Sequence, residues 1–131
     1  MIKIFVYGTL KKKCRNHNVL KEVFGRYYKN IKIKKVKTKN KYPMFKTKYN
    51  FPFLIKEEGV GFNIFGELYE TKHEIDMNIL DEFEGVPELF KRGKITVIDE
   101  NNNEYKDIEV YFCAEDIKNY KNKKLIEEWI E

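Results

Sequence analysis

Hydrophobic and polar positions along the chain form patterns that predict a mixture of strands and helices. Residues 2–7 are largely apolar and are followed by Gly8, which is typical of a buried strand that ends in a tight loop. Residues 61–70 predict a second clear strand. Residues 94–99 and 104–114 predict a hairpin whose turn is rich in asparagine. Two short extended pieces are expected around Pro43 and Pro52, because proline disfavours helix in the residue before it.

Three segments show helical spacing of apolar residues. Residues 17–24 predict a helix that Gly25 closes. A second helix is expected to begin at Thr71, where Thr71-Lys72-His73-Glu74 fits a capping box. Its apolar stripe would then be Ile75, Ile79, Leu80 and Phe83, and Gly85 and Pro87 would end it. Residues 125–130 predict a short terminal helix.

Residues 26–37 have the alternation of a strand, and the basic segment Lys29–Lys41 that overlaps them admits two interpretations. The formal net charge is +5, and lysines dominate the basic residues. A lysine-rich strand suits the edge of a sheet, where the charges prevent pairing with another chain. It also suits a nucleic-acid-binding face. Because the lysines are spread through the whole chain, a solvated surface is favoured and no nucleic-acid partner is expected.

The order of elements predicts an α+β fold in a single domain, residues 1–131. About five or six strands and three helices are expected, with no linker between them. No apolar run is long enough for a membrane span, and the N-terminus lacks the features of a signal peptide. The two cysteines, Cys14 and Cys113, do not suggest a disulfide framework. We therefore expect a cytoplasmic protein without a membrane partner.

Two stretches carry candidate chemistry. In the first, Gly8 follows the buried strand and lets backbone N–H groups converge on an oxygen atom of a ligand. The second is the acidic end of the predicted helix around residue 84. Glu84 follows Leu80 by one helical turn and borders the apolar stripe, whereas Glu82 should face solvent. Burial, the helix dipole and neighbouring acids would raise the pKa of Glu84 toward the range of a general acid/base.

Cys14 and His17 form a third candidate, as a nucleophile pair or as two metal ligands. Neither has a further partner in the sequence, since His73 lies among charged residues. A solvated loop that leads into a helix explains both residues, and we reject a metal or cysteine site.

Several motifs in order resemble the γ-glutamylcyclotransferase-like (AIG2-like) superfamily, and most closely its γ-glutamylaminecyclotransferase branch. The similarity extends from residue 2 to about residue 98. It rests on Phe5-Val6-Tyr7-Gly8-Thr9-Leu10-Lys11, Asn16-His17-x-Val19-Leu20, Tyr42-Pro43, Gly66-Glu67-Leu68-Tyr69 and Leu80-Asp81-x-Phe83-Glu84-Gly85-x-Pro87.

The resemblance implies a compact mixed β-barrel with flanking helices. It also implies a lyase-type cyclotransferase in which Glu84 is catalytic and Tyr7, Gly8, Thr9 and Leu10 bind the substrate. The substrate would be a small γ-glutamyl compound whose own α-amine attacks the γ-carbonyl, releasing 5-oxoproline and an amine such as lysine. This reaction requires no metal or organic cofactor.

Two residues depart from the pattern of the superfamily. Lys13 stands where glycine is common, and Phe90 stands where close relatives often have tyrosine. Alternative functions are a cyclotransferase for γ-glutamyl amino acids or another γ-glutamylated metabolite, and a non-catalytic binding module on the same fold.

Overall fold

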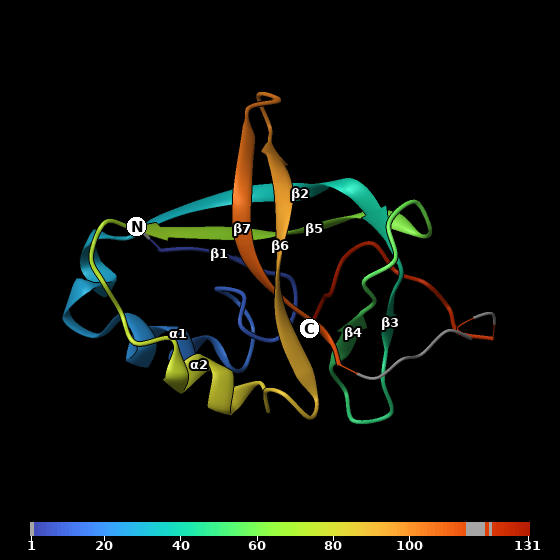
Figure 1. Ribbon diagram of the computed structural model, residues 1–131, viewed down its shortest axis with the longest axis horizontal. Coiled ribbons are helices and arrows are strands. Elements are labelled where there is room, and N and C mark those ends of the chain that lie inside the picture. Colours follow the sequence, from blue (N-terminus) through green and yellow to red (C-terminus); the bar gives the residue numbers. More distant parts are fainter. Residues whose placement is uncertain (1, 115–119, 121) are drawn as a thin grey trace.

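A closed barrel of five strands forms the centre of the molecule in the computed structural model, which describes residues 2–114, 120 and 122–131. The barrel order is β1-β5-β2-β6-β7, and a separate two-stranded sheet pairs β3 with β4 (Figure 1). In chain order the elements are β1 (Ile2–Val6), α1 (His17–Phe24), the 3₁₀ helix η1 (Gly25–Asn30), β2 (Lys32–Tyr42), β3 (Met44–Lys46), β4 (Pro52–Leu54), β5 (Phe62–Thr71), α2 (Asn78–Phe83), β6 (Phe90–Asp99) and β7 (Glu104–Cys113).

Antiparallel pairs make up most of the barrel. Strand β5 lies between β1 and β2, and β2 continues to the β6–β7 hairpin. One parallel contact, between Ile4 of β1 and Glu109 of β7, closes the ring. The β6–β7 hairpin extends beyond the other strands (Figure 1). Closure leaves each barrel strand with a neighbour on both sides, so the α+β barrel expected from the sequence is confirmed.

Two apolar clusters explain why β1 is apolar on both faces from Ile4 to Val6. One cluster receives side chains from all five barrel strands and fills the barrel, with Phe5, Val36, Ile64, Leu68, Ile95, Val97, Ile108 and Val110 among its members. The other lies between the barrel wall and the helices, and includes Ile4, Val6, Leu20, Val23, Phe24, Tyr69 and Leu80. Strand β1 therefore buries both of its faces, which removes the usual alternation of apolar and polar residues.

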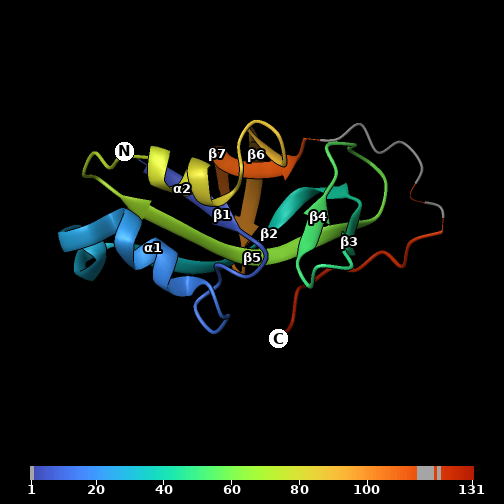
Figure 2. The same cartoon turned by 90° about the horizontal axis from the view of Figure 1, so that it is seen from below.

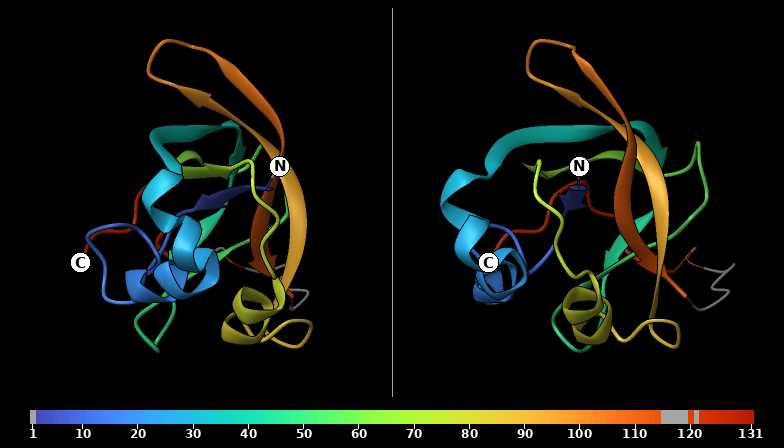
Figure 3. Two further views of the ribbon diagram at one scale, coloured as in Figure 1. Left: turned by 90° about the vertical axis from the view of Figure 1, so that its left-hand side faces the viewer. Right: turned by 60° about the vertical axis from the view of Figure 1, so that its left-hand side comes forward.

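Helices α1 and α2 contact each other and cover the same side of the barrel (Figures 2 and 3). The first matches its predicted range. The side chains of Leu20, Val23 and Phe24 are buried against the barrel, as their spacing requires. None of the helices in the described ranges is long and apolar enough to cross a membrane.

The basic strand begins later than predicted, and only part of it lies between two neighbouring strands. Residues 26–30 belong to the 3₁₀ helix η1, and the strand begins only at Lys32. It pairs with β5 on one side and with β6 on the other. The register with β6 covers only residues 36–38, so the edge interpretation fails for that part of the strand, whereas residues 32–35 pair with β5 alone among the described strands.

The predicted start of the second helix was also wrong. Thr71 is buried as the last residue of β5, where it pairs with Ile2, and the helix begins at Asn78. The Thr71 hydroxyl accepts a hydrogen bond from the N–H of His73 at 3.2 Å, within a turn and not within a helix. Pairing of β5 with β1 thus takes precedence over the capping box. The predicted end is confirmed, since Gly85 has a positive φ of 66°.

The C-terminal segment, residues 122–131, runs across the surface without forming the predicted helix. Leu125 bridges to Phe45, and the N–H of Ile126 donates to the carbonyl of Met44 at 2.8 Å. The N–H of Phe65 in β5 donates to the Glu127 carbonyl at 2.9 Å. Backbone groups of this segment are therefore bonded to β3 and β5, and Trp129 is buried.

Candidate active site

A cavity of about 140 Å³ lies between the loop that follows β1 and the C-terminal end of α2. Tyr7, Gly8, Thr9, Leu10 and Glu84 all line it, although the loop and the glutamate are far apart in the sequence. The barrel brings them together because β1 lies against the helical layer that contains α2. Its other lining residues are Phe5, Val6, Arg15, Asn16, Phe51, Pro52, Phe83, Leu89, Phe90 and Tyr111.

The loop that follows β1, residues 7–10, is called the glycine loop. Its conformation is fixed by close packing and by hydrogen bonds. A Cβ atom on Gly8 would lie 3.0 Å from Cγ of Pro52, so only glycine fits without displacing the rigid proline ring. Asn16 holds Thr9 through two bonds of 3.0 Å, from its N–H to the Thr9 carbonyl and from its side-chain amide to Oγ1. Within the described part of the chain, no hydrogen bond has the N–H of Gly8, Thr9 or Leu10 as its donor.

His17 also holds the glycine loop in place through a hydrogen bond to Leu10. Its Nδ1 lies 3.0 Å from the Leu10 carbonyl, which can only accept, so Nδ1 carries the proton. Nε2 then accepts from the Tyr28 hydroxyl at 2.7 Å. The expectation of a solvated His17 was wrong, because the side chain is buried with both ring nitrogens bonded. Asn16 bonds to Thr9 and His17 bonds to Leu10, so both residues of this motif hold the glycine loop.

Cys14 does not form a thiolate–imidazole pair with His17. Burial raises the pKa of the Cys14 thiol, which therefore stays protonated near neutral pH. In the portion of the chain that the structure describes, no group of three or more histidine, cysteine, aspartate or glutamate residues could hold a metal ion.

Two tyrosines connect the cavity to an ion pair. The Tyr7 hydroxyl donates to the backbone carbonyl of Tyr111, and the Tyr111 hydroxyl donates to Asp81 Oδ1 at 2.6 Å. Arg92 Nε lies 3.1 Å from the same aspartate oxygen. Burial, and secondarily the Glu84 carboxyl group, raises the pKa of Tyr7 well above its usual value. Burial and the bond to Asp81 raise that of Tyr111, so both hydroxyl groups remain donors.

Glu84 is positioned by the end of α2. Its N–H donates to the Leu80 carbonyl at 2.9 Å, which continues the last turn of the helix. The residue as a whole is partly buried, but its carboxyl group is desolvated, and this burial raises its pKa from 4.5 to about 7. Burial alone accounts for the change, without the expected contribution of neighbouring acids. Glu82, two residues earlier, is exposed as expected.

Phe51 and Phe90 contribute aromatic side chains to the lining of the cavity. Phe90 is buried, and its ring lies 5.6 Å from that of Phe53 and 6.2 Å from that of Phe51, measured between centroids. Phenylalanine at position 90 therefore offers the cavity no hydroxyl group. Sequence reasoning did not identify Phe51, Tyr111 or Arg15 as cavity residues, since each comes from a segment without a recognisable motif.

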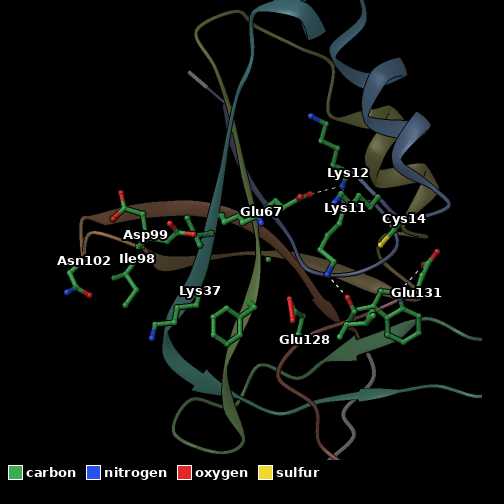
Figure 4. Close-up of a pocket in the computed structure, with 18 residues that line it drawn as sticks. Lys11, Lys12, Cys14, Lys37, Glu67, Ile98, Asp99, Asn102, Glu128 and Glu131 are labelled. Carbon is green, nitrogen blue, oxygen red and sulfur yellow. Dashed lines mark hydrogen bonds between the residues drawn. The ribbon is translucent and has the colours of Figure 1, made fainter.

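A larger groove of about 670 Å³ shares no lining residue with this cavity (Figure 4). Its floor crosses three strands at Phe65, Lys37 and Ile98, which are neighbours in the register of β5, β2 and β6. Lys13, the departure from the expected glycine, lines this groove and not the smaller cavity. Five lysines face five carboxylates there, and none of the predicted site residues is present. The smaller cavity is therefore the candidate active site.

Comparison with known proteins places these features in a family. The family model described as gamma-glutamyl cyclotransferase, AIG2-like, matches residues 4–131. Gamma-glutamylaminecyclotransferase A of Danio rerio is 39% identical over 95 residues, which are 72% of this chain and 57% of that protein. Gamma-glutamylaminecyclotransferase of Bos taurus is 35% identical over 95 residues, with 72% and 55% covered. The chain thus spans little more than half the length of these two relatives.

An archaeal relative and a solved structure are matched over more of their length. A putative gamma-glutamylcyclotransferase of Methanocaldococcus jannaschii is 34% identical over 113 residues, which are 86% of this chain and 84% of that protein. The crystal structure of an AIG2-like protein from Mus musculus superimposes with a TM-score of 0.79 at 26% identity, covering 99% of this chain and 88% of that one. The chain therefore belongs to the gamma-glutamyl cyclotransferase, AIG2-like family.

Proposed function

We propose that this protein is a cyclotransferase that converts γ-glutamylamines into 5-oxoproline and a free amine. One observation carries the proposal: Glu84, whose pKa is raised to about 7, lines the same cavity as the glycine loop Tyr7–Leu10. A carboxyl group with such a pKa exchanges protons readily near neutral pH. The names of the relatives from Danio rerio and Bos taurus support the substrate class.

In the proposed reaction the substrate supplies its own nucleophile. The α-nitrogen forms a bond to the γ-carbonyl carbon, and the bond from that carbon to the amide nitrogen breaks. The α-ammonium group loses two protons to become the lactam N–H, and the amide nitrogen gains two to leave as an ammonium group. The cavity contributes by folding the glutamyl chain so that the nitrogen and carbon atoms are close.

Glu84 would carry these protons one at a time. An α-ammonium group has a pKa of about 7.7–8.0, close to that of Glu84, so transfer between them is nearly balanced. The protonated carboxyl group then donates to the departing nitrogen. Since a general acid/base acts best when its pKa lies near the working pH, burial of Glu84 is the feature that suits it to both steps.

The loop would stabilise the oxyanion that forms when the carbonyl carbon is attacked. The N–H groups of Gly8, Thr9 and Leu10 donate to no other residue among those described, and all three residues line the cavity. Backbone donors of this kind stabilise a developing negative charge without having to reorganise. The Tyr7 hydroxyl, bonded to the Tyr111 carbonyl, would hold the start of the loop in place.

A second candidate function is a cyclotransferase for γ-glutamyl amino acids, which is considered because the name of the Methanocaldococcus jannaschii relative, a putative gamma-glutamylcyclotransferase, does not specify an amine substrate. The two functions differ only in the leaving group, and a panel of γ-glutamyl compounds assayed for 5-oxoproline separates them. Release from γ-glutamylamines supports the proposal, and release from γ-glutamyl α-amino acids alone supports the second candidate. Absence of release from every compound would refute both and leave a binding module. We propose the cytoplasm as the compartment, on the cysteine content of the sequence.

A further inference from the structure

Among the described residues that line the cavity, one side chain is positively charged, and this residue has no part in the mechanism above. Arg15 lines the cavity next to the glycine loop. Its side chain is 40% exposed, whereas the carboxyl group of Glu84 is desolvated. The arginine therefore lies at the solvent-accessible mouth, and the proposed acid/base lies deeper.

Contacts with two distant segments hold Arg15 in place. Its backbone N–H donates to Oε1 of Glu131 at 2.9 Å, and Nη1 lies 3.2 Å from Oε2 of the same carboxylate. Nη2 donates to the carbonyl of Asn50. Glu131 is itself fixed by the indole N–H of Trp129 at 3.0 Å, and Figure 4 shows it beside the loop that carries Cys14. The planar guanidinium group keeps further N–H donors for another partner.

Arg15 lies where the leaving amine of the proposed substrate would reach the mouth of the cavity. If the α-amine of the γ-glutamyl group lies at Glu84, the substituent on the amide nitrogen extends toward the mouth of the cavity. We propose that Arg15 is a specificity-determining residue that binds a carboxylate on the leaving amine, as in an amino acid linked through its side-chain nitrogen. This inference rests on the proposed function and names the chemical class of the leaving group.

The size of the effect follows from the exposure of Arg15. A charge-assisted hydrogen bond is stronger than a neutral one, but solvent screens a pair at the mouth of a cavity. Glu131 also compensates part of the positive charge. We therefore expect about a 2- to 5-fold preference in kcat/KM for a carboxylate-bearing leaving amine, expressed mainly in KM.

A matched pair of substrates tests the inference. ε-(γ-Glutamyl)-lysine and γ-glutamylcadaverine differ only in the carboxylate of the leaving amine. The wild-type protein should prefer the lysine compound, Arg15→Met should bring the ratio of the two kcat/KM values close to one, and Arg15→Lys should restore part of it. Arg26→Met is the control, since Arg26 packs on the ring of Tyr27 at 5.0 Å and does not line the cavity. It should keep the wild-type ratio.

Three outcomes would overturn the assignment. One is a wild-type ratio close to one, and another is an unchanged ratio in Arg15→Met. The third is an equal loss for both substrates, which would place Arg15 at the α-carboxylate of the glutamyl group or in a purely structural role. Failure of the proposed function is recognised separately, because the wild-type protein would then release 5-oxoproline from neither compound.

Discussion

Replacement of Glu84 by glutamine should abolish turnover and at the same time stabilise the protein at alkaline pH. Glutamine keeps the shape of the side chain but cannot transfer a proton near neutral pH. Because general acid–base groups contribute about 10²- to 10⁴-fold, kcat should fall at least that far. The stability effect arises because the cavity desolvates the ionised carboxylate of the wild-type protein.

The raised pKa of Glu84 gives the size and the sign of this stability change. One pH unit of pKa change is worth about 1.4 kcal/mol, so a rise from 4.5 to about 7 corresponds to about 3 kcal/mol. Below pH 4.5 the group is protonated in the folded and unfolded states and contributes no difference. As the pH rises from 4.5 to 7, the folded state retains the proton longer, and the wild-type protein loses stability. Above pH 7 the full difference is present.

Denaturant unfolding at about pH 4 and about pH 8.5, combined with an assay for 5-oxoproline, measures both effects. Glu84→Gln should exceed the wild-type free energy of unfolding by up to about 3 kcal/mol at the higher pH and by little at the lower pH. Glu82→Gln is the control, because Glu82 is exposed, and it should retain turnover and show no comparable pH dependence. A Glu84→Gln protein with near-normal kcat would refute the assignment of the acid/base. A stability difference that is the same at both pH values would refute the reasoning on burial.

Three further predictions concern cofactors, specificity and the support of the loop. Activity should survive exhaustive EDTA treatment, and a loss that zinc restores would contradict the mechanism. ε-(γ-Glutamyl)-lysine should be turned over with a higher kcat/KM than γ-glutamyl α-amino acids, and equal or reversed values would argue for the second candidate function. His17→Phe should lower the free energy of unfolding by about 1–3 kcal/mol and raise KM, because the buried Leu10 carbonyl loses its donor. His73→Phe, at an exposed position, should change neither in the same assays.

Local sequence patterns correctly predicted a helix with one buried face and a hairpin of two adjacent strands. The helix over residues 17–24 needed only one apolar face, and its spacing gave the correct range. The hairpin of β6 and β7 was recognised because the strands are adjacent in sequence and Asp99 accepts N–H bonds from Asn101 and Asn103 in the turn. In the helix the spacing of the apolar residues fits the one face that the barrel covers, and in the hairpin the turn contacts come from nearby residues.

The wrong predictions share a different physical cause. The capping box at Thr71 is worth about 1 kcal/mol, less than the strand pairing with Ile2 and the burial that replace it. Residues 125–130 have helical spacing, but their backbone groups find partners on β3 and β5, and Trp129 gains a buried position. Contacts with residues far away in the sequence outweighed a local preference in each case. A single sequence carries no direct signal for such contacts.

The residues of the candidate site also differ in whether a local sequence motif identifies them. Glu84 and the glycine loop each lie in a contiguous motif, so the resemblance to the superfamily identifies them from the sequence alone. In the structure they line the same cavity. Arg15 gains its position from Glu131 and Asn50, which no local pattern connects to it. The groups proposed for the common chemistry are thus carried on short motifs, whereas the residue proposed to select the leaving amine depends on the C-terminal segment. Substrate preference should therefore change more readily than reaction type when that segment is altered.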